Sequence, residues 1–296
     1  MKILPLIQAL RPKQWTKNAV VLAAFVFALG DPGQSMEPVQ ALRTALEAMF
    51  LFCLVSSAVY LLNDLRDRAL DRQHPVKKNR PIASGQVRPI TALVTAGILL
   101  TVGLTGAYWI EPNFFLILSA YLVLQIAYTL KLKQIALLDI FIIASGFVLR
   151  AMGGGFAIGV AVSPWLLLCT LLLALFLALC KRRQERIHHE TGDSRSRPSL
   201  QDYDEQLLDQ LVSMTGAATM VSYALYTLAP ETVAKFGSYK LGFTIPFVIF
   251  GIFRYLDLVY RHKKGERPEQ VLLTDGPLLV TVGLYGLTAI GLLLWL

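Results

Sequence analysis

The chain contains 296 residues, of which 55% are hydrophobic and only 16% are charged. Soluble domains carry charge on about 25% of their residues, so this composition excludes an ordinary soluble enzyme. The apolar residues also stand in blocks, and roughly 20 such residues cross a bilayer as one helix. The net charge of +8 does not indicate a nucleic-acid-binding protein, because the positive-inside bias of membrane proteins accounts for it.

The apolar blocks predict an all-α membrane bundle of nine transmembrane helices. In chain order they cover residues 15–30, 39–61, 90–110, 113–130, 136–158, 164–180, 209–229, 241–260 and 277–296. The first block is the shortest. Very short turns near residues 111 and 163 join the third block to the fourth and the fifth to the sixth, so each of these pairs is expected to form an antiparallel hairpin.

Basic residues are distributed unequally between the two faces. With the N-terminus in the cytoplasm, 23 of the 28 Lys and Arg residues fall in cytoplasmic segments and two fall on the opposite side. The positive-inside rule therefore predicts a cytoplasmic N-terminus and an outward C-terminus in the cell (inner) membrane. Residues 1–296 are expected to form one transmembrane domain. Its two large cytoplasmic segments, 62–89 (loop A) and 181–208 (loop B), are expected to cap the active site.

Loop A contains three acidic residues at helical spacing. Asp64, Asp67 and Asp71 stand at i, i+3 and i+7, so on a helix that continues from the preceding span they share a stripe about 60° wide. Three carboxylates so placed repel one another unless a cation lies among them, and Mg²⁺ prefers such oxygen ligands. Asn63 adds a neutral oxygen. The alternative is a solvated helix end, but the cationic cluster that follows suits a metal-bound diphosphate better.

These residues resemble the UbiA superfamily of intramembrane prenyltransferases, in which an NDxxDxxxD motif follows the second helix. The motif here is NDLRDRALD at 63–71, followed by RPIASG at 80–85. The resemblance covers the whole chain and implies a fold of nine helices, with the three aspartates as catalytic residues. It also implies that Mg²⁺ is bound by four side chains, Asn63, Asp64, Asp67 and Asp71.

Seven segments are similar to one branch of the superfamily, the decaprenyl-phosphate phosphoribosyltransferases. They are RPKQWTKN at 11–18, DRQHPVKKNRPIASG at 71–85, YTLKLKQIALLDI at 128–140, SGFVLRAMGGG at 145–155, KRRQE at 181–185, RPSLQDY at 197–203 and FRYLDL at 253–258. The similarity implies a glycosyltransferase that moves the 5-phosphoribosyl group of phosphoribosyl pyrophosphate (PRPP) to a polyprenyl phosphate and releases pyrophosphate. It also implies a role in cell-wall biogenesis. Assembly into a homo-oligomer is left open.

Loop B departs from the aromatic prenyltransferases of the superfamily, which carry a second Asp-rich motif there. It opens instead with KRRQE at 181–185, and cations in this place favour a phosphoribosyl donor over an allylic diphosphate. An aromatic or quinone-pathway prenyltransferase that uses a polyprenyl diphosphate is the first alternative. A lipid transporter is the second, although no inverted repeat is visible and the charged residues gather on one face.

Cations on the cytoplasmic side are the expected phosphate-binding residues. They are Lys17, Lys77, Arg80, Lys133, Lys181 and Arg182. Each has the alternative role of a surface charge under the positive-inside bias. The resemblance adds further substrate contacts in the matched segments, namely Asn18, Asn63, Tyr128, Asp139 and Glu185.

Two arginines fall inside predicted spans, where a charge is costly and usually faces a cavity or a partner. Arg150 and Arg254 are therefore expected to contact phosphate or ribose. For Arg254, a structural pair with Asp257 at i, i+3 is the alternative. Three consecutive glycines, 153–155, lie deep in a span and are interpreted as small residues that allow close helix packing or a local break in the helix.

Overall fold

A computed structural model describes residues 3–29, 37–190, 202–262, 265 and 268–294, and every regular element in these ranges is helical. The long helices are α3 (Pro38–Arg66), α5 (Pro89–Ile110), α6 (Pro112–Leu130), α7 (Leu138–Ala157), α8 (Pro164–Glu190), α9 (Glu205–Leu228), α11 (Ile245–Tyr260) and α13 (Gly276–Leu294). The short elements are α1 (Ile3–Ala9), η1 (Pro12–Leu22), α2 (Ala23–Ala28), α4 (Arg68–Gln73), η2 (Lys77–Asn79), η3 (Leu132–Gln134), α10 (Pro230–Phe236), η5 (Lys240–Thr244) and α12 (Pro268–Thr274).

Eight helical segments in the described ranges are long and apolar enough to cross a membrane, and η5 continues into α11 to form one of them. They lie close to eight of the nine predicted blocks, which confirms the all-α membrane bundle. The block predicted first, 15–30, is divided between η1 and α2 and does not form one continuous α-helix. A ninth crossing therefore stays a prediction.

Among the described elements, six α-helices begin with proline, at Pro38, Pro89, Pro112, Pro164, Pro230 and Pro268. Proline suits the first helical turn, because the N–H that it lacks would have no partner there and its φ is already helical. Four of them explain where the apolar blocks of α3, α5, α6 and α8 start. As predicted, α5 packs against α6 and α7 against α8.

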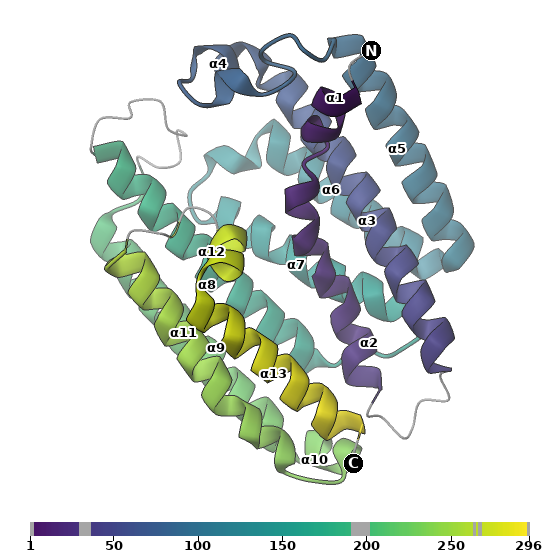
Figure 1. Cartoon of the computed structure of the whole chain (residues 1–296), viewed down its shortest axis with the longest axis vertical. Helices are drawn as coiled ribbons and strands as arrows, with labels where there is room; N and C mark the ends of the chain where they lie inside the picture. The colour runs from purple at the N-terminus through teal and green to yellow at the C-terminus, as the bar shows by residue number, and fades with distance from the viewer. Residues whose placement is uncertain (1–2, 30–36, 191–201, 263–264, 266–267, 295–296) are drawn as a thin grey trace.

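The 3-10 helix η1 is irregular backbone inside a membrane bundle. Such backbone is tolerated only where protein or a water-filled cavity surrounds it, and η1 packs against α3 and α7. Trp15 Nε1 donates to Ser57 Oγ at 3.0 Å, and Asn18 Nδ2 donates to Ser56 Oγ at 3.3 Å. In Figure 1, η1 and α2 run between the group formed by α3, α5 and α6 and the group formed by α8, α9, α11 and α13.

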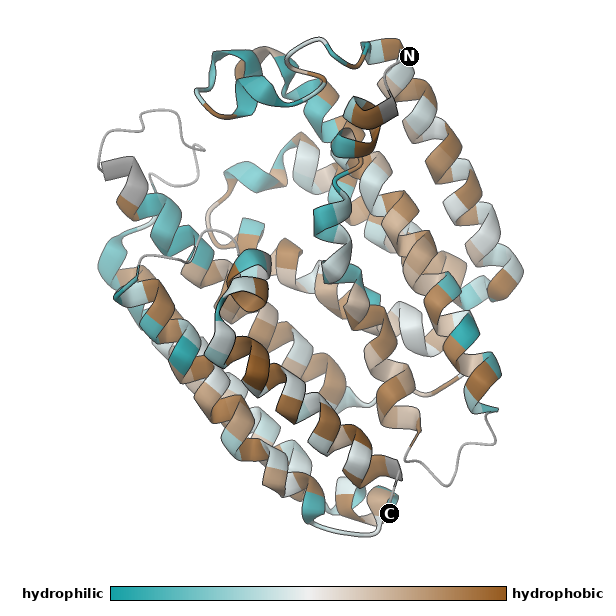
Figure 2. Ribbon diagram, viewed as in Figure 1, coloured by the Kyte–Doolittle hydropathy of each residue, from teal (hydrophilic) through white to brown (hydrophobic). Residues whose placement is uncertain are grey.

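Helices α3 and α7 form the interior of the bundle. In the apolar window of α3, 61% of residues are buried, and in that of α7 56% are, against 22% for α5, α6 and α13. The outer helices therefore present apolar side chains outward, as lipid contact requires. Figure 2 shows the same division: the long helices are largely hydrophobic, and hydrophilic residues gather around α4 and the end of α8.

The close approach of α7 to η1 depends on Gly154. A Cβ at this position would lie 1.9 Å from the carbonyl oxygen of Val21, a backbone atom that cannot move without shifting η1. The interpretation of the three glycines as a close-packing site is confirmed. We expect Gly154→Ala to lower the free energy of unfolding by about 3 kcal/mol, the upper end of the range for overpacking, and to lower the midpoint of thermal unfolding in detergent.

Gly251→Ala is the matched control for this prediction. Gly251 also lies within a helix, but a Cβ there would meet nothing within 4 Å, so stability should stay equal or rise slightly. Equal losses in the two variants would contradict a specific contact between α7 and η1.

The two predicted loops differ from expectation in opposite ways. Helix α8 continues to Glu190, so KRRQE at 181–185 lies on a helix and loop B does not begin there. Residues 191–201 of loop B lie outside the described residues. In loop A, α3 ends at Arg66, Asp67 is a turn residue, and Asp71 lies on α4. The three acids therefore do not share one continuous helix.

Candidate active site at the acidic end of the bundle

Two of the loop A acids converge on one arginine. Nη1 of Arg80 lies 3.1 Å from Oδ1 of Asp64 and 2.7 Å from Oδ2 of Asp71. Nη2 of Arg11 binds Oδ1 of Asp64 at 2.5 Å. The side chains of Asp64 and Asp71 are 3% and 6% exposed, whereas both arginines keep 27% of theirs exposed. The carboxylates are thus held inside the protein, with their cationic partners on the solvent side.

Asp67 belongs to a second cluster. Nζ of Lys133, from the turn after α6, lies 2.8 Å from Oδ2 of Asp67 and 3.5 Å from Oδ1 of Asn63. The structure therefore brings Lys133 to the acidic motif, as a counter-charge of Asp67. The four residues predicted as one metal site are divided between two clusters, one paired with Arg11 and Arg80 and the other with Lys133. In the described part of the chain, no three His, Cys, Asp or Glu side chains gather as metal ligands.

Asp64 and Asp71 nevertheless fit a magnesium site by their donor chemistry. They offer carboxylate oxygens from two elements that meet at one point, marked by the shared Nη1 of Arg80. Mg²⁺ is commonly held by one or two carboxylates together with substrate phosphates and water. Binding there requires the arginines to give up these oxygens.

A cavity of about 720 Å³ lies among the long helices. Its wall comes from η1, α2, α3, α6, α7, α8, α9, α11, α12 and α13 and is mainly apolar and aromatic. Four cationic side chains line it: Lys17, Arg150, Lys181 and Arg182. No Asp or Glu among the described residues does. A cavity with this lining suits an anionic head group and a hydrocarbon chain.

Arg11 and Tyr60 connect the acidic motif to this cavity. Tyr60 lines the cavity and lies one helical turn before Asp64 on α3. The guanidinium of Arg11 stands over the Tyr60 ring, 4.8 Å from its centroid, while it binds Asp64. Sequence reasoning did not select either residue. Two features of the sequence could have identified them. Tyr60 lies four residues before Asp64, which puts both on one face of a helix, and Arg11 lies in the matched segment RPKQWTKN.

Arg150 is held by three elements deep in the bundle. Its Nε donates to Oδ1 of Asn18 at 2.7 Å, its Nη2 donates to the hydroxyl of Tyr121 at 2.8 Å, and its Nη1 donates to the carbonyl of Gly146 at 2.9 Å. Arg150 lines the cavity, and Asn18 supports it from η1; its contact with phosphate or ribose stays a prediction. These contacts explain how the charge is accommodated within a span.

Arg182 lies at the centre of a buried network. It is 1% exposed, its Nε binds Oδ2 of Asp139 at 2.7 Å, and its Nη1 binds Glu185. The other oxygen of Asp139 accepts a hydrogen bond from the hydroxyl of Tyr203 at 2.8 Å. Tyr128 also lines the cavity near this network. The predicted residues Tyr128, Asp139, Arg182 and Glu185 are therefore brought together, and Tyr203 is an addition that sequence reasoning missed.

Arg254 is not part of the cavity wall. Its Nη1 lies 2.9 Å from Oδ2 of Asp257, and its Nη2 lies 2.7 Å from Oδ2 of Asp275. The alternative prediction of a structural Arg254–Asp257 pair is confirmed. The second contact, to Asp275, ties α11 to the start of α13. Lys77 lies on η2, where its backbone N–H donates to Nδ1 of His74, and it does not line the cavity either.

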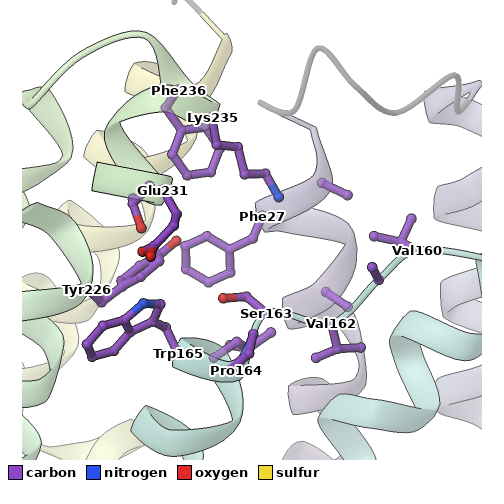
Figure 3. A pocket seen from close by; sticks show the side chains of 15 residues that line it. Phe27, Val160, Val162, Ser163, Pro164, Trp165, Tyr226, Glu231, Lys235 and Phe236 are labelled. Carbon is purple, nitrogen blue, oxygen red and sulfur yellow. The ribbon is translucent and has the colours of Figure 1, made fainter. Parts of the chain in front are cut away.

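A second pocket of about 320 Å³ lies at the α10 end of the bundle. It shares Phe27, Trp165, Leu166 and Tyr226 with the large cavity. Figure 3 shows the Phe27 ring directed toward Tyr226, and their centroids are 5.9 Å apart in an edge-on contact. In Figure 1, α10 and α4 lie at opposite ends of the molecule, so these aromatic residues form the floor of the cavity far from the acids.

Solved structures share this fold. A UbiA homolog from Archaeoglobus fulgidus, bound to DMAPP and Mg²⁺, superposes with a TM-score of 0.72 over 98% of this chain and 99% of that chain, at 18% sequence identity. A UbiA homolog from Aeropyrum pernix gives a TM-score of 0.63 over 95% of this chain and 96% of that chain, at 14% identity. At these identities the likeness supports the fold alone.

Two relatives share more sequence identity with this chain than these solved structures do. The chain is 36% identical over 277 residues to the decaprenyl-phosphate phosphoribosyltransferase of Mycolicibacterium smegmatis, which covers 91% of this chain and 86% of the relative. It is also 36% identical to the decaprenyl-phosphate phosphoribosyltransferase of Corynebacterium glutamicum, over 91% of this chain and 81% of the relative. The model of the UbiA prenyltransferase family matches residues 19–274. The chain therefore belongs to the UbiA prenyltransferase family, as its acidic motif and helical bundle predicted.

Proposed function

We propose that this protein transfers the 5-phosphoribosyl group of PRPP to a polyprenyl phosphate, such as decaprenyl phosphate, and releases pyrophosphate. The observation that carries the proposal is the cavity wall. It joins four cationic side chains to a long apolar surface, without a lining acid among the described residues. The cavity is connected to the acidic motif through Tyr60, which lines it, and Arg11, which contacts both Tyr60 and Asp64. Both substrates are phosphates, and the acceptor is also a lipid. The relatives named for this reaction support the same assignment.

The acidic motif would hold the donor through Mg²⁺ bound by Asp64 and Asp71, with Asp67 and Asn63 adjacent. When bound, the ion neutralises charge that develops on the leaving pyrophosphate. Arg11 and Arg80 stand beside these carboxylates and are placed to bind pyrophosphate oxygens. Arginine and lysine suit phosphate groups, so Lys17, Lys181 and Arg182 would bind the remaining phosphates of the donor and acceptor.

The reaction then requires positioning more than acid–base chemistry. An oxygen of the lipid phosphate attacks the anomeric carbon from the face opposite pyrophosphate. The new C–O bond forms as the bond to pyrophosphate breaks, and pyrophosphate leaves with the electron pair. The attacking oxygen is already anionic at neutral pH, so no general base is needed. Binding both substrates in one cavity supplies the orientation that a bimolecular reaction lacks.

The membrane arrangement is part of the proposal. A ninth crossing by η1 and α2, a cytoplasmic N-terminus, and an active site on the cytoplasmic side of the inner membrane follow from the positive-inside rule. In this arrangement, residues 1–296 form one domain, and loops A and B cap the cavity. Labelling single cysteines near residues 78 and 238 with a membrane-impermeant reagent checks the orientation, since only the second is expected to react from outside.

A donor assay on the purified protein in detergent tests the reaction. Ribose-labelled PRPP is offered with a polyprenyl phosphate and Mg²⁺, and in parallel a polyprenyl diphosphate is offered with 4-hydroxybenzoate. We expect label in the lipid fraction in the first assay only, and its loss on addition of EDTA. Restoration by added Mg²⁺ is the control for protein damage.

The parallel assay separates the two enzyme classes. A prenylated aromatic product without ribosyl transfer would contradict the phosphoribosyl donor and leave the metal assignment standing. Ribosyl transfer that persists in EDTA would contradict the role of Asp64 and Asp71 instead.

A further inference from the structure

Tyr203 is buried beside the cationic network and has a specific hydrogen-bonding role. It lies two residues before α9, and its side chain is 1% exposed. Its hydroxyl accepts the backbone N–H of Leu137 at 2.6 Å and donates to Oδ1 of Asp139 at 2.8 Å. Both partners lie at the start of α7, although they precede Tyr203 by 66 and 64 positions.

The first of these partners has a strained backbone. Leu137 adopts φ 64° and ψ −45° immediately before α7, a region that a branched side chain rarely occupies. Such a conformation persists only where the surrounding structure fixes it, and it is typical of functional sites. Because the N–H of Leu137 binds the Tyr203 hydroxyl, this hydroxyl stabilises the turn that directs Asp139.

The second partner leads to the cavity. Asp139 is fully buried, and its two oxygens are divided between the Tyr203 hydroxyl and Nε of Arg182. Burial raises the pKa of Tyr203, so its hydroxyl keeps the proton that it donates to Asp139. Arg182 lines the cavity, and within the described part of the chain no hydrogen bond engages its Nη2. This nitrogen is left for a ligand.

We propose that Tyr203 is a positioning residue for phosphate binding. Its hydroxyl fixes Asp139 and the turn at Leu137, and Asp139 in turn fixes the guanidinium of Arg182 at the cavity wall. The inference rests on the proposed function for the identity of the donor, but its physical content is the binding of a phosphate group by Arg182. A residue that only filled the core would not need a hydroxyl, because phenylalanine has the same ring.

The chain contains a matched network that does not reach the cavity. The hydroxyl of Tyr260 donates to Oδ1 of Asp209 at 2.7 Å, and Nε of Arg183 lies 2.5 Å from the same oxygen. This is also a Tyr–Asp–Arg series, and its arginine is the next residue after Arg182 on α8. Neither Arg183 nor Tyr260 lines the cavity. Tyr260→Phe is therefore the control for removal of a hydroxyl from such a series.

The test compares Tyr203→Phe with Tyr260→Phe in the full-length protein in detergent. We expect Tyr203→Phe to raise the KM for PRPP roughly ten-fold, as loss of a group that orients a ligand-binding residue does, with kcat changed by less than about two-fold. Tyr260→Phe should leave KM unchanged. The apparent Kd of pyrophosphate with Mg²⁺, measured by thermal shift, should follow the same pattern without any transfer reaction.

A cycle of variants separates positioning from general structure. In the background Asp139→Asn with Arg182→Met, Tyr203→Phe should not weaken pyrophosphate binding further, because the residue through which it acts is gone. The inference would be overturned if Tyr203→Phe weakened pyrophosphate binding in this background as much as it does in the wild type. It would also be overturned if Tyr203→Phe by itself had the same KM for PRPP and the same Kd for pyrophosphate as the wild type. If the wild-type protein transferred nothing from PRPP, while Tyr203→Phe still bound pyrophosphate ten-fold more weakly, only the proposed function would be refuted.

Discussion

Asp64→Asn is expected to lower kcat for phosphoribosyl transfer by more than about 100-fold, since even a partner of a metal ligand often contributes that much. The asparagine keeps the size of the side chain but loses the charge that a magnesium site requires. The fold should remain, because Arg11 and Arg80 are partly exposed and water can solvate them when their partner becomes neutral. Single-turnover rates at saturating Mg²⁺ and PRPP measure the effect, and the midpoint of thermal unfolding checks the fold.

Glu47→Gln is the control on the same helix. Glu47 accepts from Nε of Arg43 at 2.9 Å, so it is also an ion-paired acid of α3. It lies 17 positions from Asp64, about 26 Å along the helix axis. Its loss should not change the rate. Full activity in Asp64→Asn would contradict the metal assignment, whereas equal losses in both variants would indicate a general electrostatic effect.

Arg182→Met is expected to have the largest combined effect on stability and activity. Asp139 is 0% exposed, and removal of its cationic partner leaves a buried carboxylate without a counter-charge, which costs about 3–5 kcal/mol. The same substitution removes a cation from the cavity wall, so the KM for PRPP should rise as well. Thermal unfolding and steady-state kinetics report the two effects separately.

A second substitution distinguishes two possible causes of the lower stability, an unpaired buried carboxylate and lost packing around Arg182. Asp139→Asn combined with Arg182→Met removes both charges, and replacing both members of a buried pair is often neutral for stability. We expect the double variant to recover most of the lost stability and none of the phosphate binding. If stability stayed low in the double variant, the loss would come from packing around Arg182 and not from the unpaired carboxylate.

Periodicity and composition predicted most of the fold. Eight helices lie where apolar blocks stand, since each block must form a helix to satisfy its backbone in lipid. The segment 15–30 was harder, because its polar residues contact other helices, as Asn18 does, or line the cavity, as Thr16 and Lys17 do. Nothing in the local sequence indicates that α3 and α7 surround this segment and stabilise a 3-10 helix.

The candidate site was predicted by residue type better than by arrangement. The acids of loop A and the cations of α8 were identified from spacing and from resemblance to a family. Their partners depend on contacts between residues far apart in the chain, such as Lys133 with Asp67 and Tyr203 with Asp139. Spacing within a helix cannot reveal such contacts. Nor does the spacing of the acids reveal the break at Asp67, which separates Asp71 from α3.

The pairing of the three acids has a consequence for the order of binding. Asp64, Asp67 and Asp71 are balanced by Arg11, Arg80 and Lys133, so this cluster is close to electroneutral by itself. A divalent ion that takes the carboxylates displaces these cations, which then become available to an anion. Metal and diphosphate therefore favour each other's binding, and by thermodynamic linkage each raises the affinity of the other by the same factor. The metal alone would leave the displaced cations without counter-charges, and the diphosphate alone would leave the carboxylates without theirs, so the two are expected to enter as a complex.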